Sequence, residues 1–302
     1  MNQVTGEPGG SLMINTSKKG DKQMNRFVRL FGTTVAVSLL SATFVFAASY
    51  SEAPVSGGGT VTGKVTFKGP QPPPEMFDLA KFPQAEFCGK VDSKDGKRMR
   101  QDVKVKDGAL ADVVVFIEKI EKGKPFPAGA EETKMVSDNC RFLIDGGPSK
   151  AVGVILTKDS GKKGVLKVTN LDADPSDPKT AEGVLHNPHG YDVKGSMNTT
   201  IFNKPVPKKG QTLDLEVLAR WFKKSESFLK VECDQHNYMN AWALPVDNPY
   251  YAIVGDDGSF SIDQVPPGKY TIKAFHPALG FQKGQVEVAA NGKATTNFEF
   301  SK

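Results

Sequence analysis

The stretch "SFLKVECDQHNYMNAWALPV", residues 227–246, combines a strand pattern with an unusual group of soft side chains. Leu229, Val231 and Cys233 are spaced two residues apart, which places the Cys233 thiol on the same strand face as two aliphatic side chains. The alternation stops after Cys233, and "DQHNYM" is expected to form a loop before "AWALPV" resumes the apolar pattern. The sequence therefore predicts that Cys233, His236 and Met239 lie at one strand end and its loop.

A thiolate, an imidazole and a thioether are donors that copper prefers together, whereas zinc does not usually take methionine. A trigonal copper site needs a second imidazole. The remaining histidines of the chain are His186, His189 and His276. Two other interpretations of the loop stay open: a structural or redox-inert loop, and a catalytic Cys–His nucleophile that lacks an obvious orienting group.

The N-terminus has the features of an export signal. A basic segment with Arg26 and Arg29 precedes the apolar run 30–48, which ends in small residues. This pattern predicts a signal peptide over residues 1–47, with cleavage near Ala47, and hence a periplasmic, secreted or cell-surface protein. The alternative is an uncleaved membrane anchor, because the run is just long enough to span a bilayer.

The charge excludes a nucleic-acid-binding role. Residues 1–47 hold five of the 39 basic residues and two of the 34 acidic ones, so the remainder has a net charge of only +2. A nucleic-acid partner would require a basic patch or stripe.

The three cysteines, Cys88, Cys140 and Cys233, cannot all pair with one another. In an oxidising compartment thiols tend to form disulfides, so at least one has another role. Sequence alone allows three pairings. The simplest joins Cys88 to Cys140 and leaves Cys233 free, a choice that depends on the surroundings of Cys233.

The rest of the chain predicts an all-β protein built of sandwiches. The clearest strand signals cover residues 60–67, 109–120, 164–170, 212–222 and 227–233. A short helix is expected only within 76–87. In the C-terminal part, Asp257-Gly258 and Asn291-Gly292 separate alternating runs, which predicts hairpins because glycine accepts positive φ.

The Cys-x-x-His-x-x-Met loop after a strand resembles the copper loop of the cupredoxins, with the short spacing of amicyanin. The upstream "KVTNLD", followed by "HNPH", is similar to the cupredoxin strand that ends in Asn and leads to the first His ligand. The resemblance gives that role to His186, with His189 as the alternate, and implies that Asn187 ties the two ligand loops together. It implies one type 1 copper ion held by His186, Cys233, His236 and Met239.

One insertion departs from the cupredoxin pattern. "DADPSDPKTAEGV" makes the distance from Asn170 to His186 longer than is usual in that family. It carries Asp172, Asp174 and Asp177 but lacks the glycine and terminal glutamate of a calcium loop. We therefore expect a solvated loop.

The flanks resemble a second family, the carboxypeptidase regulatory-like or transthyretin-like (Ig-like) β-sandwich. The motifs are "GTVTGKVTFKG", "ALADVVVFIE" and "GDDGSFSIDQVPPGKYTIKAFHPALG". The combined resemblance implies a cupredoxin-like Greek-key sandwich inserted in, or packed with, the second sandwich, as in exported bacterial proteins often called methylamine-utilisation-like. The implied division is 1–47 signal peptide, 48–59 flexible leader, 60–125 plus 246–302 regulatory-like sandwich, and 126–245 cupredoxin-like domain. A Cys88–Cys140 disulfide would then join insert to host, and His276 would be structural.

The resemblance implies an exported one-electron carrier whose partner is another redox protein, such as a c-type cytochrome or a periplasmic oxidoreductase. Tyr238 and Trp242 would shield the metal and form a docking patch. The alternative is a non-catalytic envelope or adhesion module whose loop is structural or only stores copper. The chain has no G-x-S-x-G, H-E-x-x-H or dinucleotide fingerprint, which argues against an enzyme, and no C-x-x-C-H for covalent haem. No stable membrane span is expected after signal cleavage.

Overall fold

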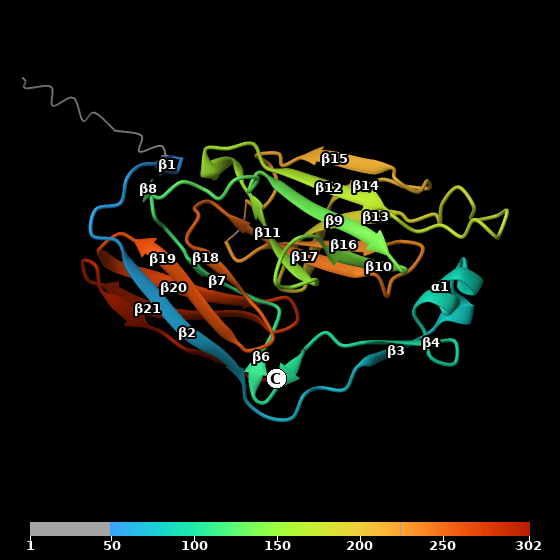
Figure 1. Cartoon of the computed structure of the whole chain (residues 1–302), viewed down its shortest axis with the longest axis horizontal. Coiled ribbons are helices and arrows are strands. Elements are labelled where there is room, and N and C mark those ends of the chain that lie inside the picture. Colours follow the sequence, from blue (N-terminus) through green and yellow to red (C-terminus); the bar gives the residue numbers. More distant parts are fainter. Residues whose placement is uncertain (1–48, 224) are drawn as a thin grey trace, which may run out of the picture. The chain divides into compact units, whose positions relative to one another are not determined.

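The computed structural model describes residues 49–223 and 225–302 (Figure 1). As the sequence predicts, this part of the chain is almost entirely β. Its helices are η1 (Leu79–Lys81), α1 (Ala85–Val91) and η2 (Lys158–Ser160). None of these described helices has the length and hydrophobicity needed to span a membrane. The predicted signal peptide, residues 1–47, lies outside the described residues.

Two sheets, here called the first sandwich, come from the two ends of the described chain. One sheet has the strand order β18-β7-β20-β21, and the other has the order β19-β2-β6-β5, with β22 and β23 also paired to β2. The strands are β2 (Gly59–Phe67), β5 (Val105–Lys106), β6 (Ala109–Leu110), β7 (Val113–Ile117), β18 (Tyr251–Val254), β19 (Ser259–Val265), β20 (Gly268–His276), β21 (Gly280–Val288), β22 (Lys293–Thr295) and β23 (Phe298–Phe300). At Gly63 only glycine fits, because an added Cβ would lie 1.7 Å from the Thr296 carbonyl oxygen.

The chain passes between these sheets at positions where the sequence predicted continuous strands or hairpins. The expected strand 109–120 is interrupted at Asp112, whose φ of 58° separates β6 in one sheet from β7 in the other. The expected hairpins at Asp257-Gly258 and Asn291-Gly292 are wrong, because β18 and β19 belong to different sheets, as do β21 and β22. These turns reverse the chain locally, but the next strand pairs with β2.

Two further sheets, the second sandwich, come from the middle of the chain. Their orders are β10-β9-β12-β15 and β11-β17-β16-β13-β14, and the pairs β9–β12 and β11–β17 are parallel. The strands are β9 (Glu132–Asp138), β10 (Arg141–Ile144), β11 (Val152–Leu156), β12 (Val165–Asn170), β13 (Pro188–Lys194), β14 (Met197–Asn203), β15 (Thr212–Glu216), β16 (Phe228–Cys233) and β17 (Asn240–Val246). The expected strand 212–222 ends at Glu216, and 227–233 forms β16 almost as predicted.

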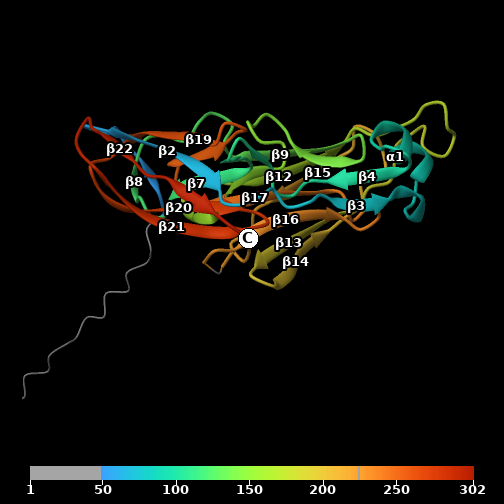
Figure 2. The same cartoon turned by 90° about the horizontal axis from the view of Figure 1, so that it is seen from below.

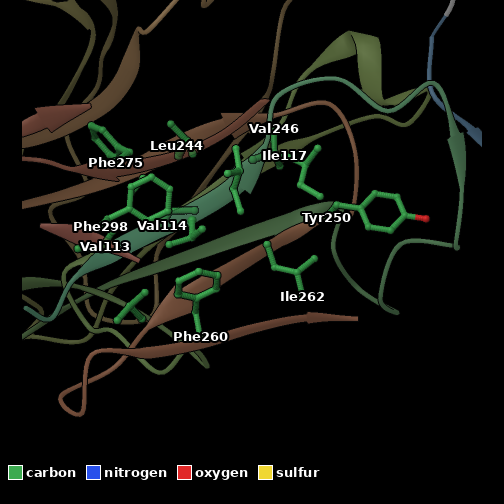
Figure 3. Close-up of a cluster of buried hydrophobic side chains, with 14 of the residues drawn as sticks. Val113, Val114, Ile117, Leu244, Val246, Tyr250, Phe260, Ile262, Phe275 and Phe298 are labelled. Atoms are coloured by element: carbon green, nitrogen blue, oxygen red, sulfur yellow. The ribbon is translucent and has the colours of Figure 1, made fainter. Parts of the chain in front are cut away.

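The buried side chains form two clusters. The first fills the first sandwich and extends to Leu244 and Val246 of β17, which Figure 3 shows near Ile117 and Phe275. The second cluster fills the second sandwich, includes Cys233, and also contains Leu79, Phe87 and Cys88. Burying each large aliphatic or aromatic side chain stabilises the fold by roughly 1.5–3 kcal/mol. The two sandwiches thus have separate sheets, while one apolar cluster contains residues from both.

Residues 75–100, here called the cover, belong to the second cluster although the sequence placed them in the regulatory-like sandwich. The cover contains β3 (Glu75–Asp78), which pairs with β4 (Lys97–Arg100), and the helices η1 and α1 between them. Leu79, Phe87 and Cys88 are buried among side chains of the second sandwich. Figures 1 and 2 both show α1, β3 and β4 away from β2 and β19–β21. The stretch 76–87, where a short helix was expected, contains η1 and the start of α1, which continues to Val91.

The segment 48–59 is not simply a flexible leader. Tyr50 is buried, and its hydroxyl donates to the Lys124 carbonyl at 2.6 Å. Strand β1 (Ser51–Glu52) pairs in parallel with β8 (Lys122–Gly123). Because β1 and β8 contain only two residues each, their pairing left no periodic signal in the sequence.

Candidate metal centre

Three predicted ligands meet at the end of β16. The Cys233 sulfur lies 3.6 Å from Nδ1 of His236 and 3.9 Å from Nδ1 of His186. With bonds of about 2.0 Å to nitrogen and 2.3 Å to sulfur, ligands in a trigonal plane lie about 3.7 Å apart. His186, Cys233 and His236 are completely buried. These three donors therefore have the composition and spacing of a metal site.

Both imidazoles direct the same nitrogen at the sulfur because their other nitrogens are already engaged. His186 Nε2 lies 2.8 Å from Oδ2 of Asp172, and His236 Nε2 lies 2.9 Å from the Pro83 carbonyl oxygen. Each acceptor places the ring proton on Nε2 and leaves the Nδ1 lone pair free. A carboxylate or carbonyl on the outer nitrogen is the usual support of a metal-bound histidine.

In the absence of a metal, the Cys233 side chain is a neutral thiol near pH 7. Burial raises its pKa to about 11, although N–H groups of Asn187, Gln235 and His236 oppose this shift. Burial lowers the pKa of His236 to about 4, with the nearby His186 adding to the effect. Near pH 7 the imidazole of His236 is therefore uncharged and able to donate its lone pair.

The tight loop after β16 is fixed by its own backbone. The His236 N–H donates to the Cys233 carbonyl, the Met239 N–H to the His236 carbonyl at 2.8 Å, and the Cys233 N–H to the Met239 carbonyl. The Met239 side chain is buried in the same apolar cluster as Cys233. The loop predicted from Cys-x-x-His-x-x-Met spacing is thus compact and closed at both ends.

Asn187 connects the two ligand segments, as expected for that position. Its backbone N–H donates to the Cys233 sulfur at 3.3 Å, and its side-chain Nδ2 donates to Asp234 at 3.1 Å. The Asp234 N–H donates back to the Asn187 carbonyl at 3.1 Å. These bonds hold the residue after His186 against the residue after Cys233.

His189, the alternate ligand, lies apart from the cluster. In the register of β13 and β16, Pro188 pairs with Cys233 and His189 with Glu232, so His189 points to the opposite sheet face. There its ring stacks on Tyr191 and contacts Asp234 and Thr200. Strand alternation thus separates His189 from the histidine that faces the thiol.

Sequence reasoning missed the role of Asp172. The insertion after β12 was expected to be solvated, but Asp172 is buried and, besides its contact with His186, accepts from the Cys140 N–H at 3.2 Å. Asn170 fixes the start of this insertion, because its side chain bonds Val184, Val206 and the Asp172 N–H. The only sequence signal for this role was the position of Asp172, an acidic residue two positions after Asn170 at the end of a predicted strand.

The cover closes the other side of the centre. Besides the Pro83 carbonyl, it brings the Cys88 sulfur to 4.0 Å from His236 Nε2. Cys88 is joined to Cys140 by a disulfide, and Cys233 is the free cysteine. The buried Arg98 donates to the Cys140 and Asn139 carbonyls, so cover and second sandwich are bound together beside the disulfide.

Tyr238 was expected to shield the metal and to form a docking patch with Trp242, but its burial leaves it only the first of these roles. It is buried against Phe82 of the cover, with ring centroids 4.9 Å apart, and the Arg98 guanidinium lies over its ring. Its ring is also 5.6 Å from that of His236. Trp242 is partly buried against the first apolar cluster. His276 lies in β20, in the first sandwich, away from the cluster.

Comparisons with known proteins support the sandwich fold in the C-terminal part. A family model described as the second β-sandwich domain of NOMO1-like BOS complex subunits matches residues 251–300. No curated protein matches the chain. A Cu-containing nitrite reductase (NirK) from Thermus scotoductus SA-01 aligns at 12% identity over 44% of this chain and 25% of that chain, with a TM-score of 0.26. A likeness at that score identifies neither fold nor function.

Proposed function

We propose that the second sandwich binds one copper ion as a type 1 site and carries single electrons between exported redox proteins. The observation that supports this proposal is the convergence of two Nδ1 atoms on the Cys233 sulfur at 3.6 and 3.9 Å, with both outer nitrogens already bonded. Two imidazoles and one thiolate form the plane of a blue-copper site, and Met239 is the candidate for the weak axial ligand. The chain would share this role with the methylamine-utilisation-like proteins that it resembles.

The side chains fit copper because little has to move. Cys233 would give up its proton and bind as thiolate, and the Asn187 N–H on its sulfur would stabilise that charge. Asp172 and Pro83 would hold the two rings in orientation. Copper, when bound, would supply a one-electron couple. The complete burial of the three ligands would exclude water in both oxidation states.

Aromatic rings that lead from His236 to the cover offer a route for the electron. The His236 ring is 5.6 Å from Tyr238, and Tyr238 is 5.8 Å from Phe77 of β3, by ring centroids. Phe77 is partly exposed. We propose that the redox partner, such as a c-type cytochrome or a periplasmic oxidoreductase, approaches the β3–β4 side of the cover.

Visible spectroscopy with Cu(II) tests this function. The wild-type chain should develop an intense thiolate-to-copper band at one equivalent, and Cys233→Ser should lack it while keeping the same circular dichroism. A folded wild-type chain without the band would refute copper binding at Cys233. That result would favour the alternative, a β-sandwich envelope or adhesion module with a structural loop.

A further inference from the structure

A second set of metal donors surrounds the Cys88–Cys140 disulfide, on the outer side of the same imidazoles. One ligand atom from each of Cys140, Asp172 and His186 lies within 4.8 Å of the others. Cys88, bonded to Cys140, has its sulfur 4.0 Å from His236 Nε2. All five residues are buried, and none is more than 3% exposed. The Cys140 sulfur, the Asp172 carboxylate and a His186 nitrogen therefore converge beside the candidate copper centre, and the Cys88 sulfur is bonded to that of Cys140.

The buried Asp172 carboxylate orients His186 and also lies next to the disulfide. The hydrogen bonds of the Asp172 carboxylate come from the Cys140 N–H and the His186 ring. The Arg98 guanidinium points instead to Asp92 and to the Asn139 and Cys140 carbonyls. A buried carboxylate beside an imidazole and the Cys140 sulfur belongs to a donor set that suits a divalent cation once the disulfide sulfurs are thiolates.

We propose that reduction of the Cys88–Cys140 disulfide creates a second, zinc-binding site formed by Cys88, Cys140, Asp172 and Nε2 of His186. Two thiolates, one imidazole and one carboxylate are all accepted zinc ligands, and four of them complete a tetrahedron. With the disulfide formed, neither sulfur can bind as thiolate, so the site exists only in the reduced chain.

The reduction step requires a thiol or phosphine reductant. With a phosphine, the S–S bond breaks, phosphorus is oxidised to phosphine oxide by taking oxygen from water, and the two water protons go to the two sulfurs. Zinc then replaces the two thiol protons, which pass to solvent. The His186 proton moves from Nε2 to Nδ1, so that Nε2 becomes a donor.

This shift of the His186 proton makes the two sites compete. Copper at Cys233 needs the Nδ1 lone pair of His186, whereas zinc at the disulfide cysteines needs the Nε2 lone pair. A neutral imidazole offers one lone pair at a time. Reduction with zinc present should therefore weaken copper binding at Cys233. This competition rests on the proposed copper function, but the second site itself does not.

The test uses the full chain carrying Cys233→Ser, in which the copper site is removed. Cobalt(II) serves as the probe, because its thiolate charge-transfer and tetrahedral bands report the ligands. After reduction with a trialkyl phosphine, one Co(II) should bind per chain and zinc should displace it. The unreduced chain should show no such bands. Failure of the copper assay in the wild type would leave this result unaffected.

Further variants in that background identify the ligands. Cys88→Ser should weaken cobalt binding by about 100-fold or more, and Asp172→Asn by at least about 10-fold. Asp174→Asn, in the same insertion but paired with Lys90 at its partly exposed surface, should bind as before. Circular dichroism of the reduced chain with zinc should match that of the unreduced chain.

Three results would overturn the second site. They are no cobalt uptake by the folded reduced chain, uptake that neither Cys88→Ser nor Asp172→Asn weakens, and unfolding of the reduced chain that excess zinc does not prevent.

Discussion

Each sandwich has a buried histidine at a strand hairpin, His276 in the first and His236 in the second, and the surroundings of the two rings differ. His276, the last residue of β20, is fully buried; its Nδ1 accepts the Ala278 N–H at 3.1 Å, and its Nε2 has no partner among the described residues. His236 is equally buried, but its Nε2 contacts the Pro83 carbonyl while its Nδ1 faces the Cys233 sulfur. Burial lowers the pKa of both to about 4.

The comparison shows that a buried, neutral histidine is not by itself a site. At His276 the ring closes a turn, and burial dominates its pKa shift, with opposing charge effects from Asp112 and Lys104. At His236 a second imidazole and a thiol converge on one point, and the outer nitrogens are held by other groups. Convergence of oriented donors distinguishes the candidate metal centre.

The largest expected effect on copper affinity distinguishes His186, the proposed ligand, from His189. His186→Ala should remove strong copper binding, a loss greater than the 10–100-fold typical of an outer support, whereas His189→Ala should leave the affinity nearly unchanged. His189 points to the other sheet face. Copper competition titrations against a chelator measure both. Equal losses in the two variants would contradict the placement of the first ligand.

Loss of the disulfide should destabilise the chain by about 4 kcal/mol on the chain-entropy model, because the bridge closes a long loop, with a sequence separation of 52. Urea unfolding of Cys88→Ala/Cys140→Ala against wild type measures this. Since the bridge ties the cover to the second sandwich, amide exchange should rise more in the cover than in β20. Uniform acceleration in both sandwiches would contradict this picture.

Acid should destabilise the metal-free chain through the buried His236 and His276. Each has a folded pKa of about 4, below the usual 6.5, so the unfolded chain binds more protons between these values. Stability is therefore complete above about pH 6.5 and falls as the pH drops to 4, by up to roughly 3 kcal/mol per histidine. Urea midpoints from pH 7 to 4 test the slope, which His276→Leu should reduce. A pH-independent midpoint would contradict this prediction.

The smallest of these effects concerns the hydrogen bond to Asp172 that orients the His186 ring. Asp172→Asn should lower copper affinity by 10–100-fold, about 1.4–2.7 kcal/mol, because the amide is a weaker acceptor for the ring proton. Asp174→Asn is the matched control in the same insertion. An unchanged affinity for Asp172→Asn would mean that the hydrogen bond does not orient the ligand.

The loop after β16 could be predicted because its signal is local. Strand phase put Cys233 on the buried face, and ligand types at a spacing of three identified the turn. The all-β class followed in the same way from alternation along 60–67 and 227–233. Such patterns predict where a strand lies and which of its faces is buried. The structure has both features in β2 and β16.

The strand pairing and the outer contacts of the two histidines depend on residues far apart in the sequence, which leave no periodic signal. Asp257-Gly258 marks a chain reversal correctly, yet whether the next strand joins its predecessor or β2 is decided by the other sheet. Asp172 was misread because its partner His186 lies across a folded insertion. The Pro83 carbonyl is a backbone group, so the residue type at that position gives no signal of its contact with His236.

X-ray absorption at the copper edge of the loaded wild-type chain tests the central claim most directly. The first coordination shell should contain one short sulfur and two imidazole nitrogens, and the sulfur should disappear in Cys233→Ser. A shell of nitrogen and oxygen only, in a folded wild-type chain with one bound copper, would contradict the assignment of His186, Cys233 and His236 as the ligands.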